Sequence, residues 1–421
     1  MINYLNKEPF SKVVQELIKF QAPESQQLVT GVDDSARAVL WAQLFNEQPR
    51  QLLIVEPVAT HLTQLVDDLQ QLLPDYPVHL FPVEEAMPIE FSVASFDNQA
   101  MRVEALTALA SGEPCVIVAS GLALRKRLTP VSIWKEAQVT LSLGDDIERL
   151  ALEKRLNYLG YTRESMVQSP GEYSIRGSII DFYPLNYEYP VRLDFFDTEL
   201  DSIRFFDAET QESIDNVESI QLLPVKDVLF SLEEQQAVLP QIQADLEKRV
   251  KKIKDDETQE QVMKGMTDHL ERLQHGDPMQ YHLAYLEYRD TKGTTLVDYL
   301  ADDGTLIINE LDRIQNRERQ SIEEDLFWIE QEMTKGNLLP GLSIKVEATE
   351  QIKNAKQPKI YCSVIQRGLG KLTFRAIHHI HYRSMNQFFN QMPLVKTEID
   401  HWLKQENIVQ VVLPTLEEAR K

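Results

Sequence analysis

Cysteine is scarce in this sequence. Among its 421 residues, only Cys115 and Cys362 are cysteines. Two thiols cannot form a framework of several disulfides, and they cannot supply a four-cysteine zinc site. Chains with so few cysteines are typical of reducing compartments, so we expect a cytoplasmic protein.

Long apolar runs are also missing. The first ten residues, MINYLNKEPF, contain no basic stretch followed by an apolar core, which a secretory signal would need. No later segment is apolar over the roughly 20 residues that a membrane-spanning helix requires. We therefore expect a chain that is neither exported nor embedded in a membrane.

Positive charge is outnumbered by negative charge. The chain has 43 lysines and arginines against 66 aspartates and glutamates, which gives a formal net charge of -23. Such a charge opposes non-specific binding to phosphate backbones, so proteins are expected as partners in preference to DNA. The two dense basic clusters, at 121–130 and 248–254, are interpreted as solvated helix faces.

With 43% hydrophobic residues, a chain of this length can form several globular domains, roughly two to four. Its first part alternates short, β-branched apolar runs with segments of helical periodicity. This alternation predicts an α/β fold with a mostly parallel sheet covered by helices. The expected strands lie at 28–32, 51–57, 78–82 and 115–120.

After Pro130 the pattern changes to aromatic segments with strand alternation, GEYSIRGSIIDFYP (171–184) and VRLDFFDTELDSIRFFD (191–207). These segments predict a small α+β unit with an antiparallel sheet, inserted into the α/β domain. The helix and strand pattern of the first part returns at 294–314. The expected domains are a split α/β domain at 1–125 and 206–350, an inserted α+β domain at 126–205, and a small α/β segment at 356–421.

The segment LVTGVDDSARA (28–38) lies where an expected strand leads into a helix, which is the position of a phosphate-binding loop. Such loops follow G-x-x-x-x-G-K-[ST], in which the lysine reaches the phosphates and the hydroxyl binds magnesium. Gly31 begins the motif, and Asp33 and Asp34 add negative charge where phosphate would lie. By itself the segment fits a lost nucleotide site and an ordinary turn about equally. The residues at the last three motif positions are Ala36, Arg37 and Ala38.

A second segment favours the lost site. TLIINELDRI (305–314) is an apolar strand with an acidic end, and it resembles the helicase strand whose Asp-Glu pair binds magnesium. Asn309 replaces the first Asp, which leaves Glu310 and Asp312. A neutral amide is a weak ligand for a hard cation. Since two elements of one ATPase are altered together, we expect no catalytic residue and no bound ATP or Mg²⁺ in this chain.

The order of these segments resembles that of the excinuclease protein UvrB. The resemblance is closer to the amino-terminal, UvrB-like modules of bacterial transcription-repair coupling factors, which have lost the same ATPase motifs. It implies a degenerate helicase-like fold and a role in nucleotide excision repair, and the aromatic strands are its most specific part. It covers roughly residues 1–350, through the segments 28–38, 115–124, 174–184, 191–207 and 294–314.

In this family the inserted domain binds the excinuclease protein UvrA through arginines and an aromatic residue. The resemblance places Arg176, Arg192 and Phe196 at the matching positions, with Arg204 as a further candidate. Arginine forms bidentate contacts with carboxylates, and an aromatic neighbour supplies a desolvated anchor. Phe196 is four residues from Arg192, so both should lie on one face of the same strand.

The alternative is that these arginines merely point outward and pair with acids on the same strands. Asp194, Asp197 and Asp201 are suitably placed, and exposed ion pairs of this kind carry little functional information. The residues alone favour this alternative. The family resemblance favours the interface.

Two further features are interpreted as non-functional. His378, His379 and His381 lie in an expected strand that points them to alternating faces, without ligand spacing to cysteine or carboxylate, so no metal site is expected. In UvrB, a long aromatic-rich hairpin probes damaged DNA. The corresponding segment, 79–100, is short and acidic and has no tyrosine, so damage probing is not expected.

The resemblance also implies which activities lie elsewhere. In the full-length family, other portions bind RNA polymerase and translocate on DNA with ATP, and no second set of helicase motifs occurs in this chain. We therefore expect a piece of a longer protein, whose present part recruits UvrA. The alternative is a free-standing, UvrB-like enzyme that binds DNA with ATP. ATP turnover and binding of UvrA distinguish the two.

Overall fold

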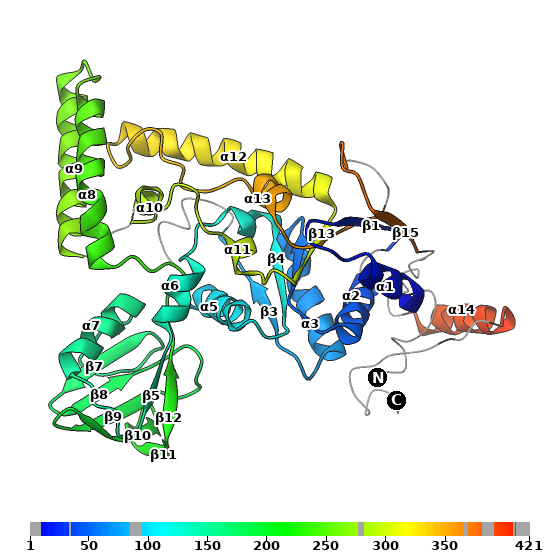
Figure 1. Cartoon of the computed structure of the whole chain (residues 1–421), viewed down its shortest axis with the longest axis horizontal. Coiled ribbons are helices and arrows are strands. Elements are labelled where there is room, and N and C mark those ends of the chain that lie inside the picture. Colours follow the sequence, from blue (N-terminus) through cyan, green and yellow to red (C-terminus); the bar gives the residue numbers. More distant parts are fainter. Residues whose placement is uncertain are drawn as a thin grey trace. The chain divides into compact units, whose positions relative to one another are not determined.

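The computed structural model describes residues 10–32, 35–84, 95–276, 282–364, 369–380, 391–406 and 409 (Figure 1). The chain divides into two compact units, 1–381 and 382–421. The described part of the second unit contains helix α14 (Met392–Lys404), in which no residue is buried. Residues 410–421, the end of the expected small α/β segment, lie outside the described residues.

A seven-stranded parallel sheet lies at the centre of the first unit (Figure 1). Its strand order is β15-β1-β14-β13-β2-β4-β3, and every neighbouring pair is parallel. The predicted α/β class and the four predicted strands of the first part are confirmed. The strands are β1 (Gln26–Thr30), β2 (Leu52–Glu56), β3 (Val78–Phe81), β4 (Val116–Ser120), β13 (Thr305–Asn309), β14 (Lys359–Ser363) and β15 (Ala376–His379).

Helices cover both faces of this sheet, which explains why its central strands are apolar throughout. In β2, Leu53 and Val55 pack into one core and Ile54 into the other, because successive side chains point to opposite faces. The first core is completed by α5 (Phe96–Ser111), α11 (Leu296–Tyr299), α12 (Leu311–Thr334) and α13 (Ala348–Asn354). The second is completed by α1 (Phe10–Lys19), α2 (Ser35–Glu47) and α3 (Leu62–Leu72).

The aromatic segments form a separate six-stranded sheet, in the order β11-β10-β9-β8-β7-β6. Its pairs are antiparallel except for β6 and β7. One face packs against α7 (Arg149–Leu159) and a two-stranded ribbon of β5 (Val139–Ser142) and β12 (Ser219–Leu222). The strands are β6 (Thr162–Arg163), β7 (Glu172–Arg176), β8 (Ile179–Phe182), β9 (Val191–Phe196), β10 (Glu199–Phe206) and β11 (Ser213–Val217).

The structure differs from the expected domain limits in two places. β14 falls in the small segment expected from 356, but it pairs with β1 and β13 and so belongs to the large sheet. β11 and β12 follow residue 205, yet they join the antiparallel part. Local periodicity cannot show which sheet a strand joins, because pairing between distant segments decides it. The other limits stay a prediction.

A helical hairpin follows the antiparallel part. α8 (Leu232–Val250) and α9 (Asp256–His275) pack against each other through a small apolar core of their own. The basic cluster 248–254 lies at the end of α8, where Lys248 and Lys251 are exposed, so this cluster is solvated as expected. Among the described helices, none combines the length and the apolar character that crossing a membrane requires.

The other basic cluster, 121–130, is not a solvated helix face, and that expectation is wrong. It begins with a short 3₁₀ helix, η3 (Gly121–Arg125), and its cations are buried. Arg125, for example, lies 2.8 Å from Asp325 of α12. Partners from distant segments make this burial possible, and no local pattern predicts them. The buried cations are Arg125, Lys126 and Arg127.

Candidate functional site

The candidate docking residues lie on the face of the antiparallel sheet that points away from its core. β9 alternates strictly between the two faces, as a half-buried strand does. Its core residues are Val191, Leu193 and Phe195. Its residues on the other face, here called the outer face, are Arg192, Asp194 and Phe196.

The strand register aligns charged residues across the outer face. Asp181 of β8 lies opposite Arg192 of β9, and Arg192 lies opposite Arg204 of β10. Arg176 ends β7, two residues beyond Ser174, which lies opposite Asp181. Arg176 and Arg192 do not lie on neighbouring strands. β8 lies between β7 and β9, and it places Asp181 between the arginines.

Asp181 is a site residue that the sequence motifs did not identify. It lies between Ile180 and Phe182, which both pack in the core, so alternation places its carboxylate on the outer face. The side chain is nevertheless 0% exposed. A carboxylate is rarely buried without cationic partners, and the alternation in SIIDF was the signal that could have drawn attention to it.

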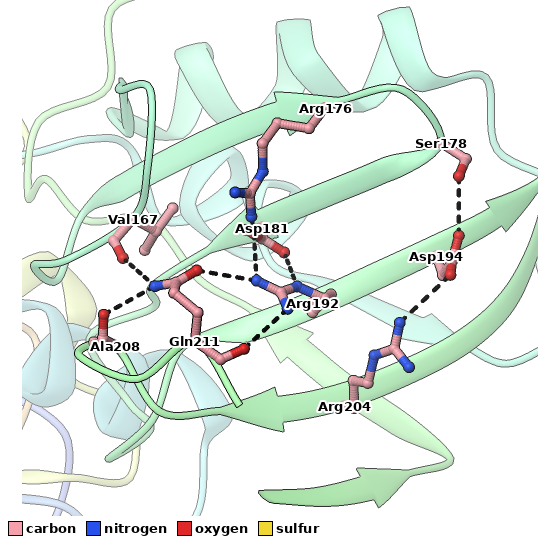
Figure 2. Close-up of polar contacts among 9 residues, drawn as sticks. All are labelled: Val167, Arg176, Ser178, Asp181, Arg192, Asp194, Arg204, Ala208 and Gln211. Carbon is pink, nitrogen blue, oxygen red and sulfur yellow. Dashed lines mark hydrogen bonds and ion pairs between the residues drawn. The ribbon is translucent and has the colours of Figure 1, made fainter. Parts of the chain in front are cut away.

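One carboxylate holds two arginines (Figure 2). Nε of Arg192 lies 2.7 Å from Oδ1 of Asp181, and Nη2 of Arg192 lies 2.9 Å from Oδ2. This is the bidentate geometry that gives arginine its strongest contacts with carboxylates. Nη2 of Arg176 lies 2.5 Å from the same Oδ2. The trio of Arg176, Asp181 and Arg192 therefore carries one net positive charge.

Arg192 is enclosed on its other sides as well. Its Nη2 and Nη1 donate to Oε1 and to the backbone oxygen of Gln211, at 3.1 and 3.3 Å. Its guanidinium carbon lies 4.3 Å from the centre of the buried Phe206 ring. Gln211 is held in turn by hydrogen bonds from its Nε2 to the carbonyls of Val167 and Ala208 (Figure 2). Only 13% of the Arg192 side chain is exposed.

The other three candidate residues are more accessible. Phe196 is 77% exposed and the Arg176 side chain 46%. Nη2 of Arg204 lies 3.4 Å from Oδ2 of Asp194, a pairing of the kind that the alternative interpretation of the sequence predicts. An exposed aromatic ring on the same sheet face as accessible guanidinium groups is chemistry that suits an interface with a carboxylate-bearing partner.

Gly31 is the first residue after β1, at the start of the segment that leads to α2. Gly31 has a φ of 81°, a conformation that favours glycine. A Cβ atom at this position would lie 2.3 Å from the backbone oxygen of Ile380, so the close approach of that segment also requires a glycine. α2 begins at Ser35, and Asp33 and Asp34 lie outside the described residues.

Arg37, at the position of the phosphate-binding lysine, contacts a carboxylate. Its Nη1 lies 3.3 Å from Oε2 of Glu56, at the end of β2. Asn309, at the end of β13, donates from Nδ2 to Oε1 of Glu56 at 2.5 Å. Burial raises the pKa of Glu56, and the contacts with Arg37 and Asn309 oppose that rise. The three side chains connect α2, β2 and β13.

The remaining residues of the degenerate motif also have structural roles. Ala36 and Ala38 are buried in the core between the sheet and α2. Glu310 adopts a φ of 49° at the start of α12. Its carboxylate accepts hydrogen bonds from the Ser363 hydroxyl at 3.2 Å and from the Val364 backbone amide at 2.7 Å. These contacts join the end of β14 to the start of α12.

The histidines near β15 have protein partners too. His378 is buried, with ring nitrogens 3.2 Å from the Glu16 carboxylate and 3.1 Å from the Gln27 side-chain oxygen. Nδ1 of His379 lies 2.9 Å from the Thr30 hydroxyl. Within the described ranges, no three histidine, cysteine or acidic residues are grouped so that they could hold a metal ion. Outside those ranges lie His381 and residues 85–94 of the short acidic segment.

A family model described as the UvrB interaction domain matches residues 139–227, which contain the whole antiparallel sheet. The chain is also 35% identical over 379 residues to a transcription-repair-coupling factor of Bacillus subtilis, a match that covers 90% of this chain and 32% of that protein. The factors of Staphylococcus epidermidis and Staphylococcus aureus are 30% and 29% identical over 397 and 403 residues. These matches cover 92% and 93% of this chain, and 33% of each relative.

The chain thus spans about one third of the length of the relatives that it matches. The match with each relative extends far beyond the interaction domain, into the parallel-sheet part of the fold. The family resemblance stated from the sequence is confirmed. Over about one third of their length, the transcription-repair-coupling factors are similar to this chain, and residues 139–227 match the UvrB interaction domain.

Proposed function

We propose that this chain is a docking module that recruits the excinuclease protein UvrA to DNA lesions at which transcription has stalled. The matched interaction domain and the relatives, which are named for coupling transcription to repair, support this function. The observation that carries the proposal is the outer face of the antiparallel sheet. There, the exposed ring of Phe196 lies on the same face as the accessible guanidinium groups of Arg176 and Arg204.

The chain performs this role without hydrolysing ATP. Its helicase-like part has an arginine at the phosphate-binding position, and that Arg37 contacts the Glu56 carboxylate. The first acid of the magnesium-binding strand is replaced by Asn309, whose amide donates to the same carboxylate. ATP, Mg²⁺, RNA polymerase and DNA are bound by portions of the full-length relatives beyond this one.

Surface plasmon resonance with purified UvrA tests the docking role. Phe196→Ala and Arg176→Ala are each expected to weaken binding about thirtyfold, or roughly 2 kcal/mol. Arg163→Ala is a matched control. Arg163 is an arginine of the same domain, 58% exposed, and it pairs with Glu153 of α7 on the core side of the sheet. Its loss should leave the affinity unchanged.

Two results would contradict the proposal. Identical affinity of the parent, Phe196→Ala and Arg176→Ala would mean that the outer face is not the docking surface. ATP turnover by the purified chain would favour the alternative function, a UvrB-like repair enzyme that binds DNA with ATP. A phosphate-release assay with and without DNA measures that turnover.

A further inference from the structure

We propose that Asp181 is a positioning residue of the outer face. It locks Arg192 into a supporting role and orients Arg176, whose remaining N–H groups then meet a carboxylate of the partner. The inference rests on the proposed function, and it changes the role of Arg192 from a contact residue to a support. The two roles differ because Arg192 uses most of its N–H groups within the domain and Arg176 does not.

The donors of Arg192 are almost fully used inside the domain. A guanidinium group carries five N–H groups. Arg192 makes four hydrogen bonds, two to the Asp181 carboxylate and two to Gln211, and these involve Nε, Nη1 and Nη2. The Phe206 ring covers one face of the guanidinium plane at 4.3 Å. A partner could therefore reach at most a small part of this group.

Arg176 has the opposite arrangement. Its contact with Asp181 is made through Nη2 alone, and nearly half of its side chain is exposed. The other N–H groups therefore remain available for a second carboxylate. Oδ2 of Asp181 lies 2.5 Å from Nη2 of Arg176 and 2.9 Å from Nη2 of Arg192. Arg176 is therefore held beside the guanidinium group of Arg192, which four hydrogen bonds keep in place. Figure 2 shows both arginines converging on this carboxylate.

This arrangement favours docking by restricting Arg176 before the partner arrives. A free arginine loses rotamer freedom when it is immobilised in an interface. Asp181 already restricts the side chain in the unbound domain, so less freedom is lost on binding. The carboxylate is buried and compensated by two cations, so it does not present a negative charge to an acidic partner.

Asp181→Asn tests the inference through the kinetics of binding to UvrA. Asparagine has the size of aspartate but lacks the charge that holds both arginines. We expect the dissociation rate to rise on the order of tenfold, with little change in the association rate. If Asp181 acted only by repelling the acidic partner, removing its charge would tighten binding. If it acted only in folding, the melting temperature would fall and the dissociation rate of the folded protein would not change. Either result would overturn the inference.

Gln211→Asn is the second variant, and it does not remove the buried charge. Gln211 has a φ of 62°, and asparagine tolerates this conformation better than most residues. The shorter side chain cannot reach Arg192 while it also holds the Val167 and Ala208 carbonyls. We expect a rise in the dissociation rate of about threefold, smaller than for Asp181→Asn because the carboxylate remains.

The same measurements separate this inference from the proposed function. Failure of the parent chain to bind UvrA would overturn both. Binding that Phe196→Ala weakens, but that Asp181→Asn and Gln211→Asn leave unchanged, would overturn only the positioning role. If Asp181→Asn fails to fold, Gln211→Asn still decides the question.

Discussion

The side-chain amide of Asn309 donates a 2.5 Å hydrogen bond to the carboxylate of Glu56. Both residues end strands of the large sheet, and these strands, β13 and β2, are neighbours. In parallel sheets, the carboxyl ends of the strands are where ligands bind. Here that edge is occupied by a hydrogen-bonded pair of the protein itself, with Arg37 as a third member.

We expect no ATP binding at millimolar concentrations of nucleotide. The loop lacks the hydroxyl that would hold magnesium, because Ala38 stands at that motif position, and Arg37 at the lysine position contacts Glu56. Isothermal titration calorimetry with Mg²⁺ and ATP measures this directly. Micromolar affinity would contradict the prediction.

Asn309→Asp should destabilise the protein in a pH-dependent way. It would place a second carboxylate against Glu56, whose pKa burial already raises above its usual 4.5. The folded-state pKa of such a pair lies above the unfolded value, so the penalty is absent below about pH 4 and grows as the pH rises. We expect a loss of about 2 kcal/mol at pH 7.5.

Urea unfolding at pH 7.5 and at pH 5 measures this loss, with Asn309→Ala as the control. The control also loses the hydrogen bond to Glu56, but it adds no charge, so its cost should vary much less with pH. Equal pH dependence of the two variants would refute the carboxylate repulsion.

Asp227→Asn should remove an acid-sensitive contribution to stability. Asp227 is buried and lies 2.8 Å from Arg102. Burial disfavours its charged form, but Arg102 and Lys126 outweigh burial and lower the pKa of Asp227 to about 2. Because the folded pKa lies below the unfolded value of 3.8, this stability is present above about pH 4 and is lost as the pH falls toward 2.

At neutral pH the Asp227→Asn variant should lose about 3 kcal/mol of unfolding free energy, since two buried cations each lose one carboxylate contact. The difference from the parent should shrink between about pH 4 and 2. Guanidinium unfolding across this range, followed by circular dichroism, measures it. A difference that stays constant over the range would mean that the charge of Asp227 is not responsible.

Arg192→Ala and Phe196→Ala should differ strongly in stability. Arg192 is largely buried, and its loss leaves the buried Asp181 with Arg176 alone. We expect about 3 kcal/mol of destabilisation for Arg192→Ala and less than about 0.5 kcal/mol for Phe196→Ala. Melting temperatures of the two variants that agree within error would refute this assignment.

Binding to undamaged duplex DNA should be weak at physiological salt, with a dissociation constant of about 10⁻⁴ M or poorer. The net charge of -23 opposes it, and the cations Arg125, Lys126 and Arg127 are buried. Fluorescence anisotropy with a labelled duplex measures the affinity. A nanomolar complex would show that the chain has a DNA-binding surface.

Several features followed from local sequence patterns. The apolar runs at β1, β2, β3 and β4 predicted a parallel sheet, and alternation predicted that Arg192 and Phe196 share a face of β9. These predictions succeeded because hydrophobic period and side-chain direction are properties of a single strand. The assignment of Gly31 to Ala38 to the positions of a phosphate-binding motif likewise needed only the local spacing of residues.

Pairing between distant segments decided which sheet a strand joins and which charged residues are buried. Local patterns in the amino-acid sequence were enough for the strands, whereas the resemblance to a known family pointed to the arginines and the aromatic residue of the outer face. Contacts in the folded chain joined β14 to the large sheet, buried Arg125 against Asp325, and placed Asp181 between Arg176 and Arg192. In each case a charged or apolar residue gained its partner from another segment of the chain. Burial and partnership depend on which segments meet in space, and no local pattern specifies that.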